Sequence, residues 1–229
     1  SCASEADELT NRDAAWRVEL RNKMKPKERT AIERCPMPEL EPAYRATKLR
    51  EEVNTGFTKE MALVEAQRCL DCPKPACMEG CPVSINIPSF VKNIERGEFI
   101  KAAQVLKMTS SLPAVCGRVC PQEKQCESQC IHLKMGHKAV AIGGLERFAA
   151  DYARESGEMP APQVAASNGK KVAVVGSGPA GLSFAGDMAK LGYAVTVYEA
   201  LHEIGGVLKY GIPEFRLPNA IVEHEIENL

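Results

Sequence analysis

The chain of 229 residues is long for one domain and short for two full ones. Its 29 basic and 30 acidic residues leave a net charge of −1, so the composition gives no indication of a nucleic-acid-binding surface. No run approaches the roughly 18 apolar residues of a membrane span. Ten cysteines without an apolar signal segment indicate a reducing compartment, which we expect to be the cytoplasm.

Residues 1–56 are charged and are predicted to form a helical and extended arm. Trp16, Leu20 and Met24 recur at helical spacing in a predicted helix over residues 13–25, and we expect this apolar stripe to serve packing. An extended, loop-like path is then predicted by Pro26, Pro36, Pro38 and Pro42.

Residues 57–157 are predicted to be mainly helical, since little strand pattern precedes residue 170. Thr58 is a good N-cap and predicts a helix that runs into Leu70. Further helices are predicted over residues 88–97, 99–107 and 142–155, the last capped by Gly157. The second group of cysteines is expected in turns around Pro113, Gly117 and Pro121.

Eight of the ten cysteines lie in two groups within this domain. The first group reads C-x2-C-x4-C-x3-C-P and contains Cys69, Cys72, Cys77 and Cys81. It matches the bacterial ferredoxin run C-x2-C-x2-C-x3-C-P except for two extra residues after Cys72. In that run the fourth cysteine ligates the other cluster of a pair. We therefore predict that the first three thiols share one iron–sulfur cube and that Cys81 points toward a second.

The second cube is predicted to take its remaining ligands from the second group, which contains Cys116, Cys120, Cys126 and Cys130. Three other interpretations compete with this one. Structural zinc is typical of C-x2-C pairs or of Cys combined with His, and the second group has no C-x2-C pair. The second alternative, disulfides, is typical of short secreted chains. The third, eight merely buried free thiols, is disfavoured because a free buried Cys is usually isolated.

Residues 158–169 are rich in Pro, Ala and Ser and are predicted to be a linker. Residues 170–229 then contain two β-branched apolar runs, at 171–175 and 194–198, which predict buried strands. A Gly-x-Gly-x-x-Gly sequence over residues 176–181 follows the first strand and opens a helix, and Glu199 ends the second strand. That context is typical of a dinucleotide-binding turn.

Each glycine of this turn, and the acidic residue after the second strand, has an expected role. Gly176 permits the tight turn, Gly178 lets the backbone approach a pyrophosphate, and Gly181 allows close packing of helix on strand. Glu199 is expected to accept hydrogen bonds from ribose hydroxyls. The alternative interpretation is a glycine-rich turn that binds no ligand. The pattern alone does not distinguish an FAD site from an NAD site.

Several segments together resemble one family. They are the cysteine array, Cys-Gly-Arg-Val-Cys-Pro (116–121), Gly-Gly-Leu-Glu-Arg-Phe (143–148), the glycine-rich turn, and Gly-Ile-Pro-Glu-Phe-Arg-Leu-Pro (211–218). The chain resembles the small (β) subunit of NADPH-dependent glutamate synthase over about residues 25–229. The same module occurs in dihydropyrimidine dehydrogenase, in the large subunit of NADH-dependent ferredoxin:NADP oxidoreductase and in archaeal sulfide dehydrogenase.

The resemblance implies a multidomain α and α/β protein. An all-helical iron–sulfur domain of the α-helical ferredoxin type is followed by the start of a Rossmann-like FAD-binding domain. It also implies two 4Fe–4S clusters. The ligands of the first are Cys69, Cys72, Cys77 and Cys130. The ligands of the second are Cys81, Cys120, Cys126 and Glu146. Spacing alone would use Cys116 and leave Glu146 as a solvated helix charge, so the eighth ligand stays open.

For FAD, the resemblance implicates Gly176, Ser177, Gly178, Pro179, Ala180, Gly181, Glu199, Gly205, Gly206, Val207 and Arg216. The four histidines show no i, i+4 pairing and are expected to be surface or packing residues. The chain opens at Ser1 without an initiator Met and stops at Leu229, before a complete FAD domain or any NADPH domain. We therefore expect a fragment or a split gene product that cannot oxidise NADPH alone.

In the complete protein, the resemblance implies electron transfer from NADPH or NADH through FAD and the two clusters to a partner. The expected partner is a larger catalytic subunit of the glutamate synthase type. A ferredoxin-linked flavoprotein or a pyrimidine-reducing subunit is an alternative. A non-catalytic electron-relay or docking module is a third interpretation, which predicts iron without flavin. No nucleic acid or membrane partner is expected.

Overall fold

The computed structural model describes residues 7–229, and the chain divides into two compact units. One unit runs to Pro38 and resumes from Gly56 to Met159, whereas the other joins Glu39–Thr55 to Pro160–Leu229. The sequence predicted a single arm over residues 1–56, but the structure divides that segment between the two units. Residues 1–6 of the expected arm lie outside the described part.

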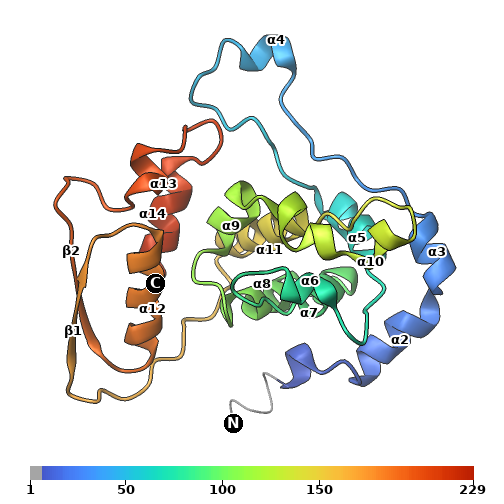
Figure 1. The fold of residues 1–229 in the computed structure, drawn as a ribbon, viewed down its shortest axis with the longest axis horizontal. Helices are drawn as coiled ribbons and strands as arrows, with labels where there is room; N and C mark the ends of the chain where they lie inside the picture. Colours follow the sequence, from blue (N-terminus) through green and yellow to red (C-terminus); the bar gives the residue numbers. More distant parts are fainter. Residues whose placement is uncertain (1–6) are drawn as a thin grey trace. The chain divides into compact units, whose positions relative to one another are not determined.

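The first unit consists of helices and turns (Figure 1). Its longer helices are α2 (Ala15–Lys23), α3 (Pro26–Ala31), α5 (Lys59–Gln67), α7 (Ile87–Glu95), α8 (Phe99–Lys107), α9 (Pro113–Val119) and α11 (Ile142–Ser156). Its single turns of helix are α6 (Ala76–Glu79), η1 (Gln122–Lys124), η2 (Glu127–Gln129) and α10 (Ile131–Lys134). Helix α11 packs against α7, α8 and α9, and α7 packs against α5 and α8.

The local signals predicted most of these helices correctly. The Thr58 hydroxyl accepts a hydrogen bond from the Met61 amide at 3.3 Å and caps α5. Gly157, with a φ of 65°, ends α11 in the left-handed conformation that glycine adopts without steric cost. Helix α8 has the predicted limits.

Two predictions about prolines and turns were wrong. Pro26 and Pro42 begin short helices rather than an extended path, because the first helical position needs no amide donor. Pro113 likewise begins α9, where turns were expected. Gly117 lies inside α9, and a Cβ there would stand 2.5 Å from the backbone nitrogen of Arg147. This glycine therefore serves close helix packing and makes no turn.

The hydrophobic core of the first unit forms between α5, α7, α8 and α11. Phe90, Val91 and Ile94 of α7 are fully buried, as are Leu106 of α8 and Leu145 of α11. Burial of aliphatic and aromatic side chains of this size stabilises a fold by roughly 1.5–3 kcal/mol each. The backbone around the cysteines is thereby fixed to a rigid helical frame.

The second unit contains two parallel strands, β1 (Lys171–Val175) and β2 (Ala194–Tyr198), paired from Lys171 with Ala194 to Val175 with Tyr198. Both have the predicted limits, but the prediction that they are buried was wrong, because most of their residues are exposed or only partly buried. Helix α12 (Pro179–Lys190) connects them and packs against both strands. Three further helices belong to this unit: α4 (Pro42–Arg45), α13 (Val207–Tyr210) and α14 (Asn219–Glu227).

The segment from Glu39 to Thr55 belongs to the second unit through backbone hydrogen bonds. The Leu40 amide donates to the Val53 carbonyl at 2.8 Å, which closes the segment into a loop. The Val53 amide donates to the Phe215 carbonyl at 2.9 Å. The loop is thereby attached to the stretch between α13 and α14.

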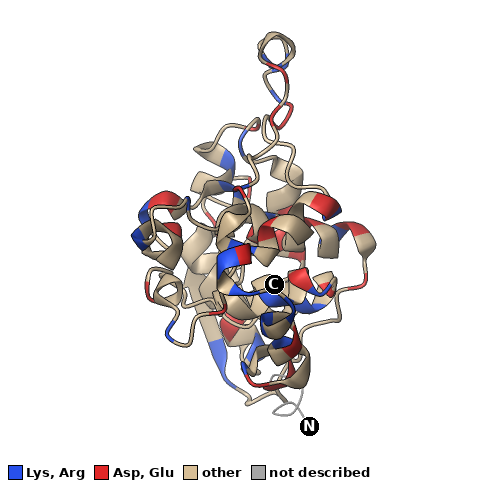
Figure 2. Cartoon of the chain, turned by 90° about the vertical axis from the view of Figure 1, so that its right-hand side faces the viewer, with Lys and Arg blue, Asp and Glu red and all other residues tan. Residues whose placement is uncertain are grey.

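Basic and acidic side chains are interspersed along the helices (Figure 2). Several form buried pairs, such as Arg68 with Glu65 at 2.6 Å and Arg29 with Glu95 at 2.9 Å. Among residues 7–229, no helix combines the length and the apolar composition required to cross a bilayer.

Candidate functional site

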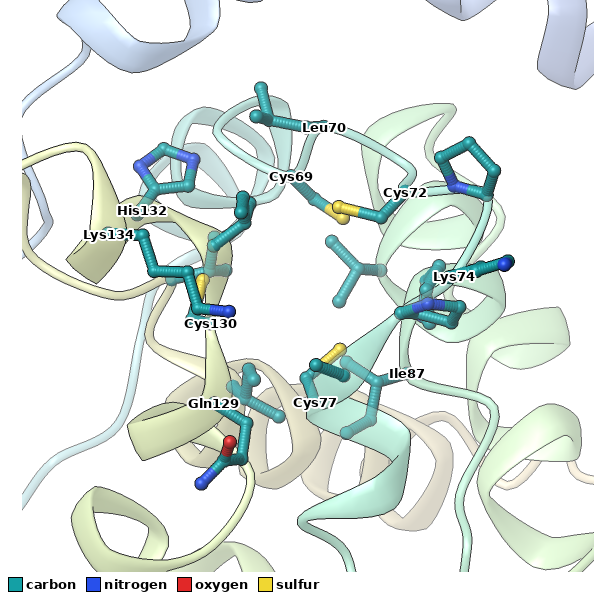
Figure 3. A pocket seen from close by; sticks show the side chains of 18 residues that line it. Cys69, Leu70, Cys72, Lys74, Cys77, Ile87, Gln129, Cys130, His132 and Lys134 are labelled. Atoms are coloured by element: carbon teal, nitrogen blue, oxygen red, sulfur yellow. The ribbon is translucent and has the colours of Figure 1, made fainter.

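A cavity of about 530 Å³ in the helical unit is lined by four thiols, those of Cys69, Cys72, Cys77 and Cys130. Figure 3 shows the sulfur atoms of Cys69, Cys72 and Cys77 turned toward the cavity, with Cys130 on another wall. The structure thus brings together the four residues that the family resemblance assigns to the first cluster. Cys130 lies far along the sequence from the other three, yet it lines the same cavity.

Each of these thiols is positioned by a helix or a helix end. Cys69 follows α5, and its amide donates to the Ala66 carbonyl at 3.2 Å. Cys77 lies in α6, and Cys72 lies in the loop between these helices. Cys130 separates η2 from α10. The loop after α5 and the turn before α10 therefore meet across the cavity.

The wall behind the thiols is apolar and includes Ile87, Val91, Val140 and Ile142. Burial raises the pKa of the Cys69 thiol to about 11 and also raises the pKa values of Cys72 and Cys77. Thiols in such surroundings carry a negative charge only when a cation binds them.

These observations fit a 4Fe–4S cluster, whose ligand set is four thiolates and whose irons supply the positive charge. Within the described residues, no group of three or more His, Cys, Asp or Glu side chains is arranged to hold a single metal ion.

A second group of side chains lies in the same unit and contains Cys81, Cys116, Cys120, Cys126 and Glu146. A hydrogen bond with the Cys116 thiol lowers the pKa of Cys120, against the opposing effects of burial and of the charges of Glu146, Cys126 and Cys81. Burial, with nearby carboxylates and Cys81, raises the pKa of Cys126 to about 12. Cys81 and Glu146 thus both act electrostatically on Cys120 and Cys126.

Two helices position this second group. Cys116 lies in α9 and Cys120 directly follows it, while Glu146 lies in α11, which packs on α9. The Ser110 hydroxyl donates to the Cys116 sulfur at 3.9 Å, and Glu146 is only 5% exposed. Both candidates for the eighth ligand therefore lie beside Cys120.

The residue that anchors the first cysteine loop has no signal in the cysteine pattern. Asp71, between Cys69 and Cys72, is fully buried and forms ion pairs with Arg17 and Arg21, each at 2.6 Å. The i, i+4 spacing of the two arginines on one helix face was a signal, but their partner could not be inferred from it.

Two other polar residues lie next to the cavity, and the sequence indicated no role for the first of them. Lys92 is fully buried in α7 and donates to the Cys69 carbonyl at 2.6 Å. His132 lines the cavity, is fully buried and lies with its Nε2 2.9 Å from the Arg68 carbonyl oxygen. It is therefore a packing residue, as expected for the histidines.

The glycine-rich turn of the second unit lies between β1 and α12. Gly176 has a φ of 95°, a conformation that favours glycine. A Cβ on Gly181 would stand 2.1 Å from the Gly176 carbonyl oxygen, so only glycine lets α12 start so close to β1. A Cβ on Gly178 would meet nothing within 4 Å, so open space lies beside this residue.

Glu199 lies at the end of β2 and is bonded to the same turn. Its Oε2 accepts hydrogen bonds from the Ser177 amide, at 2.9 Å, and from the Ser177 hydroxyl. Its Oε1 accepts one from the Leu201 amide at 2.9 Å. The Ser177 hydroxyl is the largest cause that lowers the pKa of Glu199, to about 2. A carboxylate has about four acceptor positions, so roughly one remains for a ligand.

The second pair of glycines packs against this turn. The Gly205 amide donates to the Ser177 hydroxyl at 3.1 Å, and a Cβ on Gly206 would stand 2.9 Å from the Gly178 Cα. The structure thus brings the 205–206 pair to the dinucleotide turn. Pro179 and Ala180 begin α12, and Val207 begins α13. Arg216 is exposed in the turn before α14.

Comparison with known families assigns both units. Residues 45–158 match the family described as dihydropyrimidine dehydrogenase domain II, 4Fe-4S cluster. Residues 174–225 match the NAD(P)-binding Rossmann-like domain. The predicted order of a helical iron–sulfur domain and a Rossmann-like domain is confirmed.

Similar curated proteins include the glutamate synthase [NADPH] small chains of Azospirillum brasilense, 37% identical over 84% of this chain, and Escherichia coli, 38% identical over 82%. The NAD-dependent dihydropyrimidine dehydrogenase subunit PreT of Salmonella typhimurium is 37% identical over 78%. The chain spans 40%, 40% and 43% of these three proteins, respectively. The predicted resemblance is confirmed.

Proposed function

We propose that this chain, which is 37% and 38% identical to two glutamate synthase small chains, is the electron-transfer part of an iron–sulfur flavoprotein oxidoreductase. When bound, FAD supplies the acceptor for hydride from NADPH or NADH, and two 4Fe–4S clusters supply a one-electron relay to a partner. The observation that carries the proposal is the cavity lined by four thiols from two distant segments.

The first cluster is held by Cys69, Cys72, Cys77 and Cys130. Support comes from their common cavity and from its apolar wall. Burial and hydrogen bonds to sulfur are two of the properties by which a protein sets the potential of such a cluster. The chain therefore contributes the four thiol ligands and the apolar surroundings of the cluster.

The second cluster is held by Cys81, Cys120, Cys126 and Glu146. The buried position of the Glu146 carboxylate beside Cys120 supports its role as the eighth ligand. Cys116 is already engaged with the Ser110 hydroxyl and with Cys120, which suits a supporting residue. Replacing one thiolate by a harder carboxylate gives the two clusters different potentials.

FAD binds at the turn of residues 176–181 and at the glycine pair 205–206. The open space beside Gly178, at the N-terminal end of α12, suits a pyrophosphate. Glu199 accepts a ribose hydroxyl at its remaining position while Ser177 fixes its orientation. Val207 and Arg216 complete the flavin contacts that the resemblance assigns.

The partner in the leading proposal is a larger subunit of the glutamate synthase type, since the relatives include small chains of that enzyme. A second candidate is an electron-input subunit for a dihydropyrimidine dehydrogenase or ferredoxin-linked partner, because the PreT relative is equally similar at 37% identity. The nine described cysteines are free thiols, which suits a reducing compartment such as the cytoplasm.

Counts of iron, acid-labile sulfide and flavin test this proposal. The anaerobically purified and reconstituted chain is expected to hold about eight irons and about eight sulfides, as two cubes require, together with one FAD. Visible absorbance that dithionite bleaches should accompany them. Zinc in place of iron would refute the proposal, and iron without flavin would favour the electron-relay interpretation instead.

A further inference from the structure

The loop that carries Cys69 and Cys72 has an unusual residue between them. Asp71 has a φ of 53°, in the left-handed region that non-glycine residues seldom occupy, and its side chain is fully buried. Such a conformation is unfavourable for a residue with a side chain and persists only where surrounding contacts enforce it. Those contacts all come from one segment near the start of the chain.

The Asp71 carboxylate is held by two guanidinium groups of α2. Arg17 donates from Nη2 to Oδ1 at 2.6 Å and from Nε to Oδ2 at 3.0 Å. Arg21 donates from Nη1 to Oδ2 at 2.6 Å.

The backbone of Asp71 is held as well. Arg12 donates to the Asp71 carbonyl from Nε at 3.1 Å and from Nη2 at 3.0 Å. Arg21 also donates to the Arg12 carbonyl at 2.7 Å, and Arg17 donates to the Ser89 hydroxyl in α7 at 2.7 Å. Arg12, Arg17 and Arg21, called here the arginine cluster, thus tie the cysteine loop to two helices.

We propose that Asp71 is a positioning residue for the first iron–sulfur cluster. The arginine cluster holds Asp71 in its left-handed conformation, so that Cys69 and Cys72 on either side face the cavity. This inference rests on the proposed function, because it requires that the four thiols hold a cluster. The arginine cluster would then support the cluster site, although the sequence indicated only an arm in this segment.

The geometry supports this role in two ways. A buried ion pair that loses its carboxylate leaves uncompensated buried cations, which strongly destabilises the local structure. The Arg12 guanidinium is also bound to the Asp71 carbonyl, directly before Cys72, and nearby charge is one property that sets cluster potential. The Asp71 contacts should therefore influence both retention and potential of the first cluster, and neither property of the second.

The test uses the full 229-residue chain loaded with iron and sulfide under anaerobic conditions. Cluster loss is followed by EPR during incubation with an iron chelator, and a Cys77→Ser variant identifies the signal of the first cluster. In Asp71→Asn, which keeps the side-chain shape, the first cluster is expected to be lost about tenfold faster or more. The second cluster should be lost at the wild-type rate.

A milder variant covers the case in which Asp71→Asn does not fold. Arg12→Gln removes the bonds to the Asp71 carbonyl and leaves the buried ion pairs intact. It is expected to lose the first cluster several-fold faster and to lower the reduction potential of that cluster alone, since one positive charge is gone. Glu39→Gln is the matched control, because it removes a carboxylate from the Arg45 pair in the second unit.

The outcomes separate this inference from the proposed function. If the wild-type chain holds no cluster, the proposed function fails and the inference fails with it. If the wild-type chain holds two clusters but Asp71→Asn and Arg12→Gln lose both at one common rate, Asp71 stabilises only the fold and the inference alone is overturned. Wild-type retention and potential in Arg12→Gln would also overturn it.

Discussion

Gly117 in α9 lies directly against Arg147 in α11, so that a Cβ on Gly117 would stand 2.5 Å from the Arg147 backbone nitrogen. Cys120 directly follows α9, and Glu146 precedes Arg147. The close approach of the two helices therefore sets the spacing between two ligands of the proposed second cluster.

Replacing Gly117 by Ala is expected to push α9 away from α11. Overpacking of this kind typically costs about 1–3 kcal/mol of unfolding free energy. Thermal unfolding should show a lower midpoint, and iron analysis should show preferential loss of the second cluster. Unchanged stability with full iron content would contradict the proposed packing role.

Gly178→Ala and Gly181→Ala should separate ligand binding from folding. The added Cβ has open space at Gly178 but would stand 2.1 Å from a carbonyl oxygen at Gly181. Gly178→Ala is therefore expected to fold with wild-type stability but lose flavin, because its methyl group occupies the space proposed for the pyrophosphate. Gly181→Ala should lose both stability and flavin. Flavin content and thermal unfolding measured together decide this, and full flavin occupancy in Gly178→Ala would argue against the proposed site.

The Glu199 carboxylate should make the second unit sensitive to acid. Hydrogen bonds from Ser177 and neighbouring amides lower its pKa to about 2, from an ordinary value near 4.3. A pKa lowered in the folded state stabilises the fold above the ordinary value, and this contribution is lost as the pH falls from about 4.3 toward about 2. Hydrogen exchange of residues 171–205, corrected for intrinsic rates, should show protection at pH 5 that declines by pH 3.

Glu199→Gln is the control for this effect, because an amide does not titrate in this range. The variant should show weaker protection at pH 5 and little further change at pH 3. An acid response as large as that of the wild-type chain would assign the effect to other groups.

The loop of residues 39–55 should stabilise the stretch that contains Arg216. Val53→Pro removes the amide that donates to the Phe215 carbonyl, which should cost about 1 kcal/mol or more locally. Faster hydrogen exchange over residues 211–218 is the expected result. Val53→Ala keeps the amide and should leave that exchange near the wild-type rate, whereas equal effects of both variants would point to the side chain instead.

Local sequence patterns predicted the parts of the fold that depend on local interactions. The strands at 171–175 and 194–198 follow from continuous β-branched apolar runs, and helix α8 follows from its apolar positions. The four thiols of the cavity followed from cysteine spacing combined with the family resemblance. The structure places these four thiols around one cavity, and their role as cluster ligands stays a prediction.

The missed features depend on contacts between distant segments. Gly117 was interpreted as a turn residue because only the position of Arg147 shows that it permits helix packing. Asp71 was passed over because its partners Arg17 and Arg21 lie in a different part of the sequence. The attachment of Val53 to Phe215 likewise has no local signal, so residues 39–55 were predicted to belong to a separate arm.

The iron content of Cys77→Ser and Cys130→Ser tests most directly the claim that two distant segments hold one shared cluster. The account predicts that each variant loses about four of about eight irons, with loss of the same EPR signal. Cys35→Ser, which lies outside both thiol groups, should retain all of them. Loss of different signals from the two variants, or full iron retention in Cys130→Ser, would contradict the shared cluster.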